Sequence, residues 1–298
     1  MRFLRSFLAS LSVAPALGVG LLLLASFAGA VHPAGDALAV FRPALVGIGV
    51  TSALLAFVAT RRREWLLAAV GVACIGLTVL PPRSAPPRSP HEPVFVHYQK
   101  NLYFQNPAPH TVIADIRRQA PDFVTLQEVT DRLRPVLAGT GLRTQLLCPF
   151  AGVGGVAVAS KWPAEPGTAS CADGVARVQV RTPVGRVWVA SVHLHWPWPY
   201  GQAAQVARAW PEFAEAEGPW VIGGDFNMVP WSHTIGRLRR HTDTIVASGH
   251  RRSFDVAHLY PLAIDHVLVP EQAGVVSVDL RPRLGSDHDG VVVRFALR

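Results

Sequence analysis

Charged side chains are scarce in this chain of 298 residues. Asp, Glu, Lys and Arg together make up 16% of it, whereas hydrophobic residues make up 50%. A typical soluble domain has about a quarter of its residues charged. The low charge and high apolar content exclude a disordered or fibrous chain, and they predict membrane-spanning segments.

Acidic residues are almost missing from the first third of the chain. Residues 1–90 contain eight Arg against Asp36 and Glu64, a net charge of +6, and residues 91–298 contain the other 20 basic and 18 acidic residues, a net charge of +2. The formal charge of +8 therefore belongs mainly to the N-terminal part. It is not the footprint of a nucleic-acid-binding surface on the remainder.

Cysteine is also rare, and its three positions show no Cys/His spacing typical of a metal site. Cys74 lies in an apolar run and is expected to act as a small apolar residue. Cys148 and Cys171 lie in the C-terminal part. Two interpretations remain open for them: a disulfide in an oxidising compartment, or two buried thiols.

Charge is absent from three long apolar stretches, about residues 7–31, 43–60 and 65–81. A spanning helix needs about 20 apolar residues. Residues 1–81 are therefore predicted to form a bundle of about three transmembrane helices. Core helices of a soluble domain are the alternative, but three such runs leave almost no polar face. The first stretch could also be a signal peptide, because Ala28-Gly29-Ala30 resembles a cleavage site.

Arginine clusters predict the orientation of these helices. Arg2 and Arg5 precede the first stretch, and residues 61–63 are all Arg. Because positive loops stay on the cytoplasmic side, the chain is expected to leave the third helix outward. Residues 82–92 form a Pro-rich, extended linker, and residues 93–298 are predicted to be an extracytoplasmic domain of a multi-pass cell-membrane protein.

Residues 93–298 show the mixed pattern of an α/β domain. The segments Val175–Val180 and Val187–His195 alternate and are joined by a turn, which predicts a β-hairpin. Thr111–Gln119 has apolar residues at helical spacing between two expected strands. Hairpins mixed with helical crossovers predict two mixed sheets with helices packed outside.

Polar side chains follow successive strands of this domain. Gly224-Asp225-Phe226-Asn227 follows one buried strand, and Ser286-Asp287-His288 precedes the last. The other polar residues at strand ends are Asn101, Glu128, His193 and Asp265. Each alone is typical of a turn or of a packed polar side chain. Together they indicate a catalytic site.

These motifs, in this order, resemble the endonuclease/exonuclease/phosphatase superfamily of deoxyribonuclease I-, exonuclease III- and sphingomyelinase-like enzymes. The resemblance covers roughly residues 93–298 and rests on Leu126-Gln127-Glu128, Gly224–Asn227 and Ser286–His288. It implies a four-layer α/β sandwich of two mixed β-sheets flanked by helices. After Asn101 the chain has Leu102-Tyr103-Phe104 in place of the acid and glycine of abasic-site endonucleases, so abasic-site repair is not expected.

The resemblance also implies a function and a site. It implies a membrane-tethered, divalent-metal-dependent phosphodiester hydrolase that uses Mg²⁺ or Mn²⁺, in which water attacks the metal-bound phosphate in line. The expected metal ligands are Glu128, Asn101 and Asp287. The expected catalytic residues are His193, Asp225, Asn227, Asp265 and His288: Asp225 activates the water, Asn227 holds it or a phosphate oxygen, Asp265 pairs with His288, and His193 donates to the phosphate or leaving group. His195 is a second candidate for the role of His193.

The sequence leaves the substrate open. The aromatic residues Trp196, Trp198 and Tyr200 follow the histidine strand, and Trp231 follows Asn227 closely. Such side chains could stack on a base, enter a lipid interface or only pack. The alternatives are thus a nuclease, a lipid phosphodiesterase and, third, an inactive binding domain. The expected partners are a phosphoester substrate and the bilayer, with no protein partner predicted.

Overall fold

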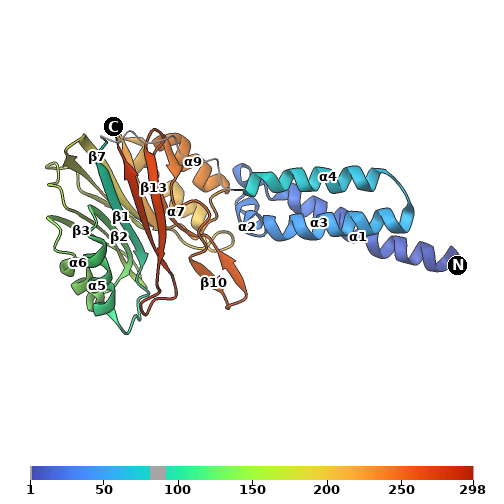
Figure 1. Ribbon diagram of the computed structural model, residues 1–298, viewed down its shortest axis with the longest axis horizontal. Helices are drawn as coiled ribbons and strands as arrows, with labels where there is room; N and C mark the ends of the chain where they lie inside the picture. Colours follow the sequence, from blue (N-terminus) through green and yellow to red (C-terminus); the bar gives the residue numbers. More distant parts are fainter. Residues whose placement is uncertain (1, 81–91, 298) are drawn as a thin grey trace. The chain divides into compact units, whose positions relative to one another are not determined.

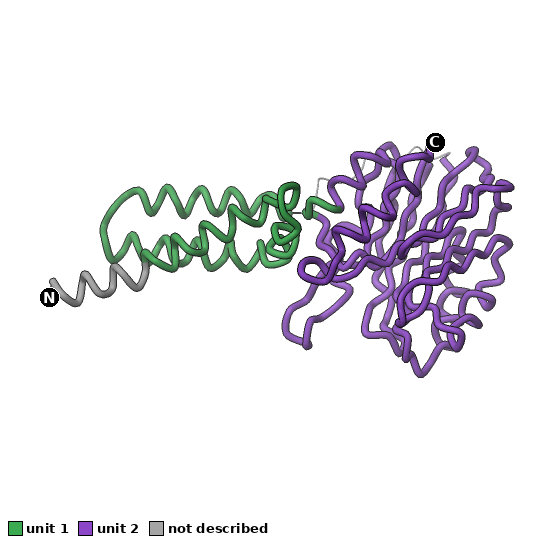
Figure 2. Tube along the Cα trace, turned by 180° about the vertical axis from the view of Figure 1, so that it is seen from behind, with its two compact units in different colours: residues 1–81, 231–234 green, residues 82–230, 235–298 purple. Residues whose placement is uncertain are grey.

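The computed structural model describes residues 2–80 and 92–297, with side chains from residue 13 onward. The chain forms two compact units, one of residues 1–81 and 231–234 and one of residues 82–230 and 235–298 (Figure 2). The expected linker, 82–92, lies outside the described residues except for its last position.

The first unit is helical. Its three longer helices, α1 (Arg2–Ala25), α3 (Arg42–Thr60) and α4 (Glu64–Gly76), run side by side (Figure 1). A short helix, α2 (Ala34–Val40), joins α1 to α3, and 3-10 turns cover Ala28–Ala30 and Leu77–Val79. The unit therefore has helices in all three predicted apolar stretches, but with different bounds.

Those bounds change the membrane prediction. Within the described residues, α3 is long and apolar enough to cross a membrane, whereas the apolar helical segments Val13–Ala25 and Glu64–Val79 are shorter. The first stretch does not continue as one helix to residue 31, because the chain turns after Ala25 and Ser26 is held by buried Arg42, whose Nη2 donates to the Ser26 carbonyl oxygen at 2.6 Å. Among the residues whose side chains are described, the structure thus gives one candidate span, against the three expected.

The second unit contains two six-stranded mixed sheets (Figure 1). The first sheet has the order β13 (Gly274–Arg281), β14 (Gly290–Ala296), β1 (Val94–Asn101), β2 (Phe123–Val129), β4 (Gly154–Ser160) and β3 (Thr144–Ala151). The second has the order β5 (Ser170–Ala172), β6 (Val175–Thr182), β7 (Gly185–His193), β8 (Trp220–Asp225), β12 (Asp265–Pro270) and β9 (Thr244–Val246). Only β1–β2 and β7–β8 are parallel pairs among these strands. A separate hairpin pairs β10 (Phe254–Val256) with β11 (Tyr260–Leu262).

Helices cover the outer faces of both sheets. On the first sheet, α5 (Pro109–Gln119) and α6 (Arg134–Gly139) share an apolar cluster with Tyr98, Val124 and Leu126. On the second, Phe213 packs against Trp220, and the helices there are α7 (Gln202–Ala209), α8 (Pro211–Ala214) and α9 (His233–Thr242). Two mixed sheets flanked by helices, as predicted, therefore build this unit.

The layer between the sheets changes character along the strands. Its core cluster includes Phe95 and Phe123 from the first sheet and Val189 and Val221 from the second. Further along the same strands the buried residues are polar: His97, Gln99 and Asn101 in β1, Thr125 and Gln127 in β2, Ser191 and His193 in β7, and Asp225 in β8. Alternate residues of a strand lie on the same face. The residues of each strand that face the layer are therefore apolar at one end of the strand and polar at the other.

Two hairpins and a disulfide complete the unit. The β6–β7 hairpin confirms the predicted alternation, whereas the β3–β4 hairpin was not predicted. Cys148 of β3 and Cys171 of β5 form a disulfide with a Cα–Cα distance of 5.4 Å. Of the two interpretations left open by the sequence, the structure has the bridge, and it joins the edges of the two sheets.

Candidate active site

Strand direction brings the predicted polar residues to one end of the inter-sheet layer. In each parallel pair, β1–β2 and β7–β8, the strands end at the same edge of their sheet. The β12 strand runs antiparallel to β8, so Asp265 lies directly opposite Asp225 in the register. The final loop then returns His288 to the same place just before β14 begins.

Asp265 and His288 form a buried pair. Oδ2 of Asp265 lies 2.7 Å from Nδ1 of His288 and accepts a 2.5 Å hydrogen bond from the Ser253 hydroxyl. Oδ1 accepts a 3.0 Å hydrogen bond from the Gln99 amide. The structure thus brings together the two residues that the sequence placed on different strands.

The pairing sets the charge of both groups. Burial lowers the pKa of His288, but the Asp265 and Asp225 carboxylates outweigh it and raise the pKa to about 9. Burial raises the pKa of Asp265, but the His288 charge and hydrogen bond outweigh it and hold that pKa below its usual value. An imidazolium hydrogen-bonded to a carboxylate is therefore the neutral-pH state of this pair.

Asp225 lies at the centre of the site. Its Oδ1 accepts the backbone N–H of Asn227 at 2.9 Å, and its Oδ2 accepts the Asn101 amide at 3.0 Å. Oδ2 also lies 3.6 Å from Nε2 of His193 and 3.7 Å from Nε2 of His288. Burial raises the pKa of Asp225 to about 7, so this carboxyl group gains and loses a proton near neutral pH.

His193 is the histidine that faces Asp225, and the ring of Phe150 lies against both His193 and His195. Burial lowers the pKa of His193 to about 4, and the charge of His288 adds to the shift. The lowered pKa favours a neutral His193 side chain near pH 7. Its Nδ1 is buried and has no hydrogen-bond partner among the described residues.

Glu128 and Asn101 form a second polar pair beside Asp225. The Asn101 amide nitrogen lies 3.1 Å from Oε1 of Glu128, and the Phe104 backbone N–H donates to Oε2 at 2.7 Å. Burial raises the pKa of Glu128. Glu128 has a positive φ of 58°, which interrupts the β2–β4 pairing at this point. Asp287, the third expected ligand, is exposed.

These residues fit a hard divalent cation. Glu128, Asp225 and Asp265 bring three largely buried carboxylates to one place, and the structure supplies oxygen atoms, the ligands that Mg²⁺ and Mn²⁺ prefer. One carboxylate or imidazole atom each from Asp225, Asp265 and His288 lies within 4.8 Å of the others, but the protonated His288 is paired with Asp265, which leaves Asp225 and Glu128 as the carboxylates available to a cation. The expected ligands Glu128, Asn101 and Asp287 are not members of this cluster. Asn101 is linked to it by its hydrogen bond to Asp225.

The remaining predicted residues have different environments. The Asn227 amide nitrogen donates to the Leu194 carbonyl oxygen at 2.8 Å, so one end of this side chain is already engaged. Trp196 packs on Phe254, whose ring lies 4.6 Å from His288. Trp198 and Tyr200 are exposed. Trp231 belongs to the first unit, where its indole N–H donates to the Ala39 carbonyl oxygen.

Several supporting residues were missed by the sequence reading. Gln99 bridges Asp265 and Gln127, and Gln127 in turn donates to Ser191. Lys100 is buried, and its ammonium donates to the His288 carbonyl oxygen at 2.9 Å. The alternation in β1 could have indicated Gln99, because it shares the inward face with Asn101. Ser253 lies in a loop and had no comparable signal.

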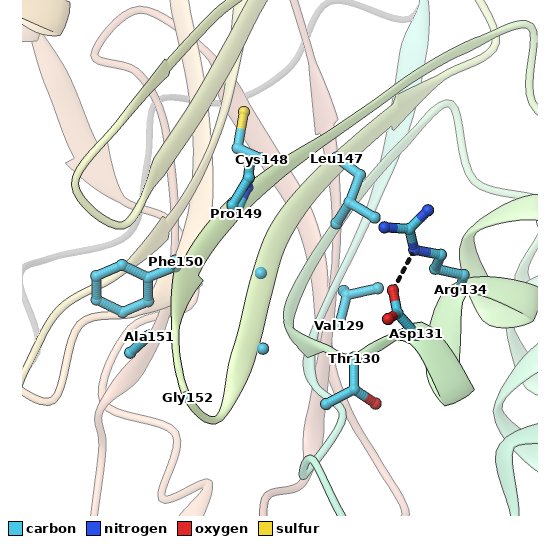
Figure 3. Close-up of a pocket in the computed structure, with 12 residues that line it drawn as sticks. Val129, Thr130, Asp131, Arg134, Leu147, Cys148, Pro149, Phe150, Ala151 and Gly152 are labelled. Atoms are coloured by element: carbon cyan, nitrogen blue, oxygen red, sulfur yellow. Dashed lines mark ion pairs between the residues drawn. The ribbon is translucent and has the colours of Figure 1, made fainter.

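A hollow of about 450 Å³ opens beside the end of β2 (Figure 3). Its walls include Val129, Thr130 and Arg134 on one side and the β3–β4 hairpin on the other. Arg134 pairs with Asp131 at 2.8 Å at its rim. None of Asp225, Asp265 and His288 lines this hollow, so it adjoins the strand that carries Glu128 without containing the carboxylate–histidine cluster.

Comparison with known proteins gives one family. Residues 98–288 match the Endonuclease/Exonuclease/phosphatase family, and comparison with curated proteins finds no match. An endonuclease/exonuclease/phosphatase from Beutenbergia cavernae is 20% identical, with a TM-score of 0.53 over 68% of this chain and 72% of that one. One from Bacteroides vulgatus is 16% identical, with a TM-score of 0.54 over 70% and 100% of the two chains. A humanized D. rerio TDP2 is 15% identical, with a TM-score of 0.55 over 68% and 99%. At these identities the solved structures show a shared fold.

Proposed function

Because the chain belongs to the endonuclease/exonuclease/phosphatase family, whose members hydrolyse phosphoester bonds, we propose that it is a divalent-metal-dependent phosphodiester hydrolase. The observation that carries this proposal is the buried cluster in which Asp225 lies beside both the His288–Asp265 pair and the Asn101–Glu128 pair. The expected catalytic side chains and the expected metal ligands, except the exposed Asp287, are largely buried at this end of the layer. An inactive binding domain would not need so many buried, mutually dependent polar groups.

Glu128 would hold the metal, with Asp225 beside it. The Asn101 amide nitrogen donates to both carboxylates and its oxygen accepts the Tyr103 backbone N–H at 2.9 Å, so Asn101 would position Glu128 and Asp225 beside a bound metal. A bound Mg²⁺ or Mn²⁺ would neutralise the phosphate oxygens and stabilise the leaving oxygen. Asp287 is too exposed to be a buried ligand, and we propose that it contributes charge at the rim.

The chain's own groups supply the proton chemistry. Asp225 would accept a proton from the attacking water, which suits a carboxyl group whose pKa is near 7. His288 would present positive charge to the phosphate, sustained by Asp265. His193, neutral at this pH, would donate a hydrogen bond to a non-bridging or leaving oxygen. Asn227 would hold the water or a phosphate oxygen through its amide oxygen, because its nitrogen is engaged by Leu194.

We also propose that the enzyme is tethered to the cell membrane and acts outside the cytoplasm. The candidate span Arg42–Thr60 supports the tether. Because the arginines at residues 61–63 would keep the end of this span in the cytoplasm, the outward orientation also requires the shorter apolar segment Glu64–Val79 to cross back, and that crossing is part of the proposal. The Cys148–Cys171 disulfide supports an oxidising compartment for the catalytic unit.

Apolar side chains around the site favour a lipid substrate. Leu259, at the tip of the β10–β11 hairpin, is 86% exposed, and Trp198 and Tyr200 are also exposed. Burial of the Leu259 side chain among lipid acyl chains is favourable. An aliphatic side chain cannot stack on a nucleic-acid base as an aromatic ring does. A nuclease is the second candidate, supported by the Trp196–Phe254 aromatic row that leads to His288.

The full chain, purified in detergent, tests this proposal. Hydrolysis of bis(4-nitrophenyl) phosphate should require Mg²⁺ or Mn²⁺, stop with excess chelator and be lost in Glu128→Gln. The matched control is Glu271→Gln, an exposed carboxylate of the same unit, which should retain activity. Activity in excess chelator would refute the metal role. Phospholipid vesicles and single- and double-stranded DNA as substrates then separate the two candidates, and a reporter fused after Arg298 tests the orientation.

A further inference from the structure

The two histidines of the site are held in different ways. Nδ1 of His288 is fixed by the Asp265 carboxylate, as is usual for a catalytic imidazole. Nδ1 of His193 is buried without a hydrogen-bond partner among the described residues. The rotation of the His193 ring is therefore not set by a hydrogen bond to that nitrogen, and some other contact must hold it toward Asp225.

The backbone of His193 is anchored on both sides. Its N–H donates to the Gly174 carbonyl oxygen at 2.8 Å, and its carbonyl oxygen accepts the Gln205 amide at 2.8 Å. Gly174 has a φ of +78°, and a Cβ there would lie 2.3 Å from the His193 carbonyl oxygen, so only glycine fits. These bonds fix the main chain but leave the ring free to turn about its side-chain torsions.

Phe150 supplies the missing contact. Its ring centroid lies 5.5 Å from that of His193, with the planes inclined at 61°, and 5.2 Å from that of His195. Figure 3 shows the Phe150 ring on the opposite side of the β3–β4 hairpin from Asp131 and Arg134. An edge-to-face ring contact is directional, so it favours one orientation of the imidazole.

The disulfide links the two sides of this arrangement. Cys148 lies two residues before Phe150 in β3, and Cys171 lies three residues before Gly174. The bridge therefore ties the strand that carries Phe150 to the turn that accepts the His193 N–H. The same strands belong to different sheets, so no backbone ladder holds these two segments together.

We propose that Phe150 is a positioning residue for His193 and that the Cys148–Cys171 disulfide holds Phe150 in place, so that reducing the disulfide slows turnover. The inference rests on the proposed function of His193 in phosphodiester hydrolysis. It links the activity to an oxidising environment through a defined contact rather than through global stability alone.

Variants of the full chain in detergent, assayed on bis(4-nitrophenyl) phosphate with Mn²⁺, test the role of Phe150. Phe150→Leu should lower kcat by about tenfold or more and leave KM nearly unchanged, because a misplaced catalytic group costs turnover. Phe150→Tyr, which keeps the ring, should restore most of the rate. The matched control is Leu147→Ala on the other side of the same hairpin, which should lower the melting temperature and spare kcat. An unchanged kcat in folded Phe150→Leu would overturn the proposal.

A double variant separates this inference from the proposed function. In a His193→Ala background, Phe150→Leu should cause no further loss, because both changes remove one contribution. Fully additive losses would overturn the positioning role while leaving His193 catalytic. Full activity of His193→Ala alone would instead refute the proposed role of His193.

The disulfide link is tested by Cys171→Ser and by reducing wild-type protein with a phosphine, with the folded state checked by melting temperature. Either change should lower kcat toward that of Phe150→Leu and add little to that variant. Unchanged turnover in a folded, fully reduced sample would refute the disulfide's role.

Discussion

The two ends of the inter-sheet layer are equally buried but differ in chemistry. At one end Phe95 stacks between Phe123 and Phe295, with ring centroids 5.7 and 6.0 Å away. At the other end the same β1 strand contributes His97 and Gln99, both fully buried. The apolar end lowers the free energy of the fold by removing hydrocarbon from water. The polar end must satisfy each hydrogen-bonding group and gains little by burial alone.

The difference shows what the polar end is for. Its hydrogen bonds run from Gln127 through Gln99 to Asp265 and on to His288, so the network ends at the pair that we propose to be catalytic. Two of its buried atoms, Nδ1 of His97 and Oε1 of Gln99, have no partner among the described residues. A layer selected for stability alone would carry apolar residues here, as it does at Phe95. Four experiments test this division, taken from the largest expected effect to the smallest.

Phe95→Ala should destabilise the protein strongly and spare catalysis. The ring is 2% exposed and packs against three other aromatic rings, so its removal leaves a cavity and costs about 3–5 kcal/mol. Chemical denaturation measures the loss, and kcat at a temperature where the variant is folded should match wild type. A large fall in kcat of the folded variant would contradict the view that the apolar end serves stability and the polar end serves catalysis.

Asp265→Asn and His288→Ala should each lower kcat by about a hundredfold or more, as for one preorganised electrostatic group. The two side chains share a 2.7 Å contact, so the double variant should be little worse than the worse single variant. Steady-state kinetics of the three variants provide the test. Additive losses would mean that the residues act independently, and loss of melting temperature without loss of turnover would mean that Asp265 serves only the fold.

His97→Gln should reduce the loss in the free energy of unfolding that occurs as the pH falls below about 6.5. Burial lowers the pKa of His97 to about 3, so below pH 6.5 the unfolded chain binds a proton that the folded chain refuses. The free energy of unfolding therefore falls as the pH drops, by up to about 1.4 kcal/mol per pH unit from this group. His288, with a raised pKa, acts oppositely and loses its contribution between pH 6.5 and about 9. Urea unfolding of both proteins at pH 7, 6 and 5 measures the difference, and parallel curves would contradict it.

Gln99→Leu should have the smallest effect, a fall in kcat of about tenfold, as is typical when a group that orients a catalytic residue is lost. The amide donates to Oδ1 of Asp265 at 3.0 Å and makes no contact proposed for substrate. Thr125→Val is the matched control, because its hydroxyl bonds to His97 and not to Asp265. Equal losses in both variants would show a general effect of polar burial rather than one transmitted through Asp265.

Short sequence patterns identified the features that depend on neighbouring residues, namely individual strands, a hairpin and motifs at strand ends. The β6–β7 alternation and the Gly-Asp-Phe-Asn motif marked their strands, and family resemblance placed Asp265 beside His288. Ser253 and Phe150 could not be found in this way, because each lies in a segment without a motif, and Phe150 also meets His193 from a distant part of the chain. The apolar stretches were identified, but the helix break after Ala25 depends on a contact between Ser26 and Arg42, which hydropathy does not encode.

The start of β12 carries two buried polar residues side by side, and this limits how the sheet can assemble. Asp265 faces the layer between the two sheets. His266 faces the other way, and its Nε2 lies 2.7 Å from the Met228 carbonyl oxygen, to which it is hydrogen-bonded. Sliding β12 past β8 by one position would exchange these faces. The imidazole would then occupy the carboxylate's place, and the carboxylate would be buried against the helices. A chain with this wrong register would bury two polar side chains without hydrogen-bond partners. The resulting loss of stability disfavours the wrong register and selects the native pairing of β12 with β8.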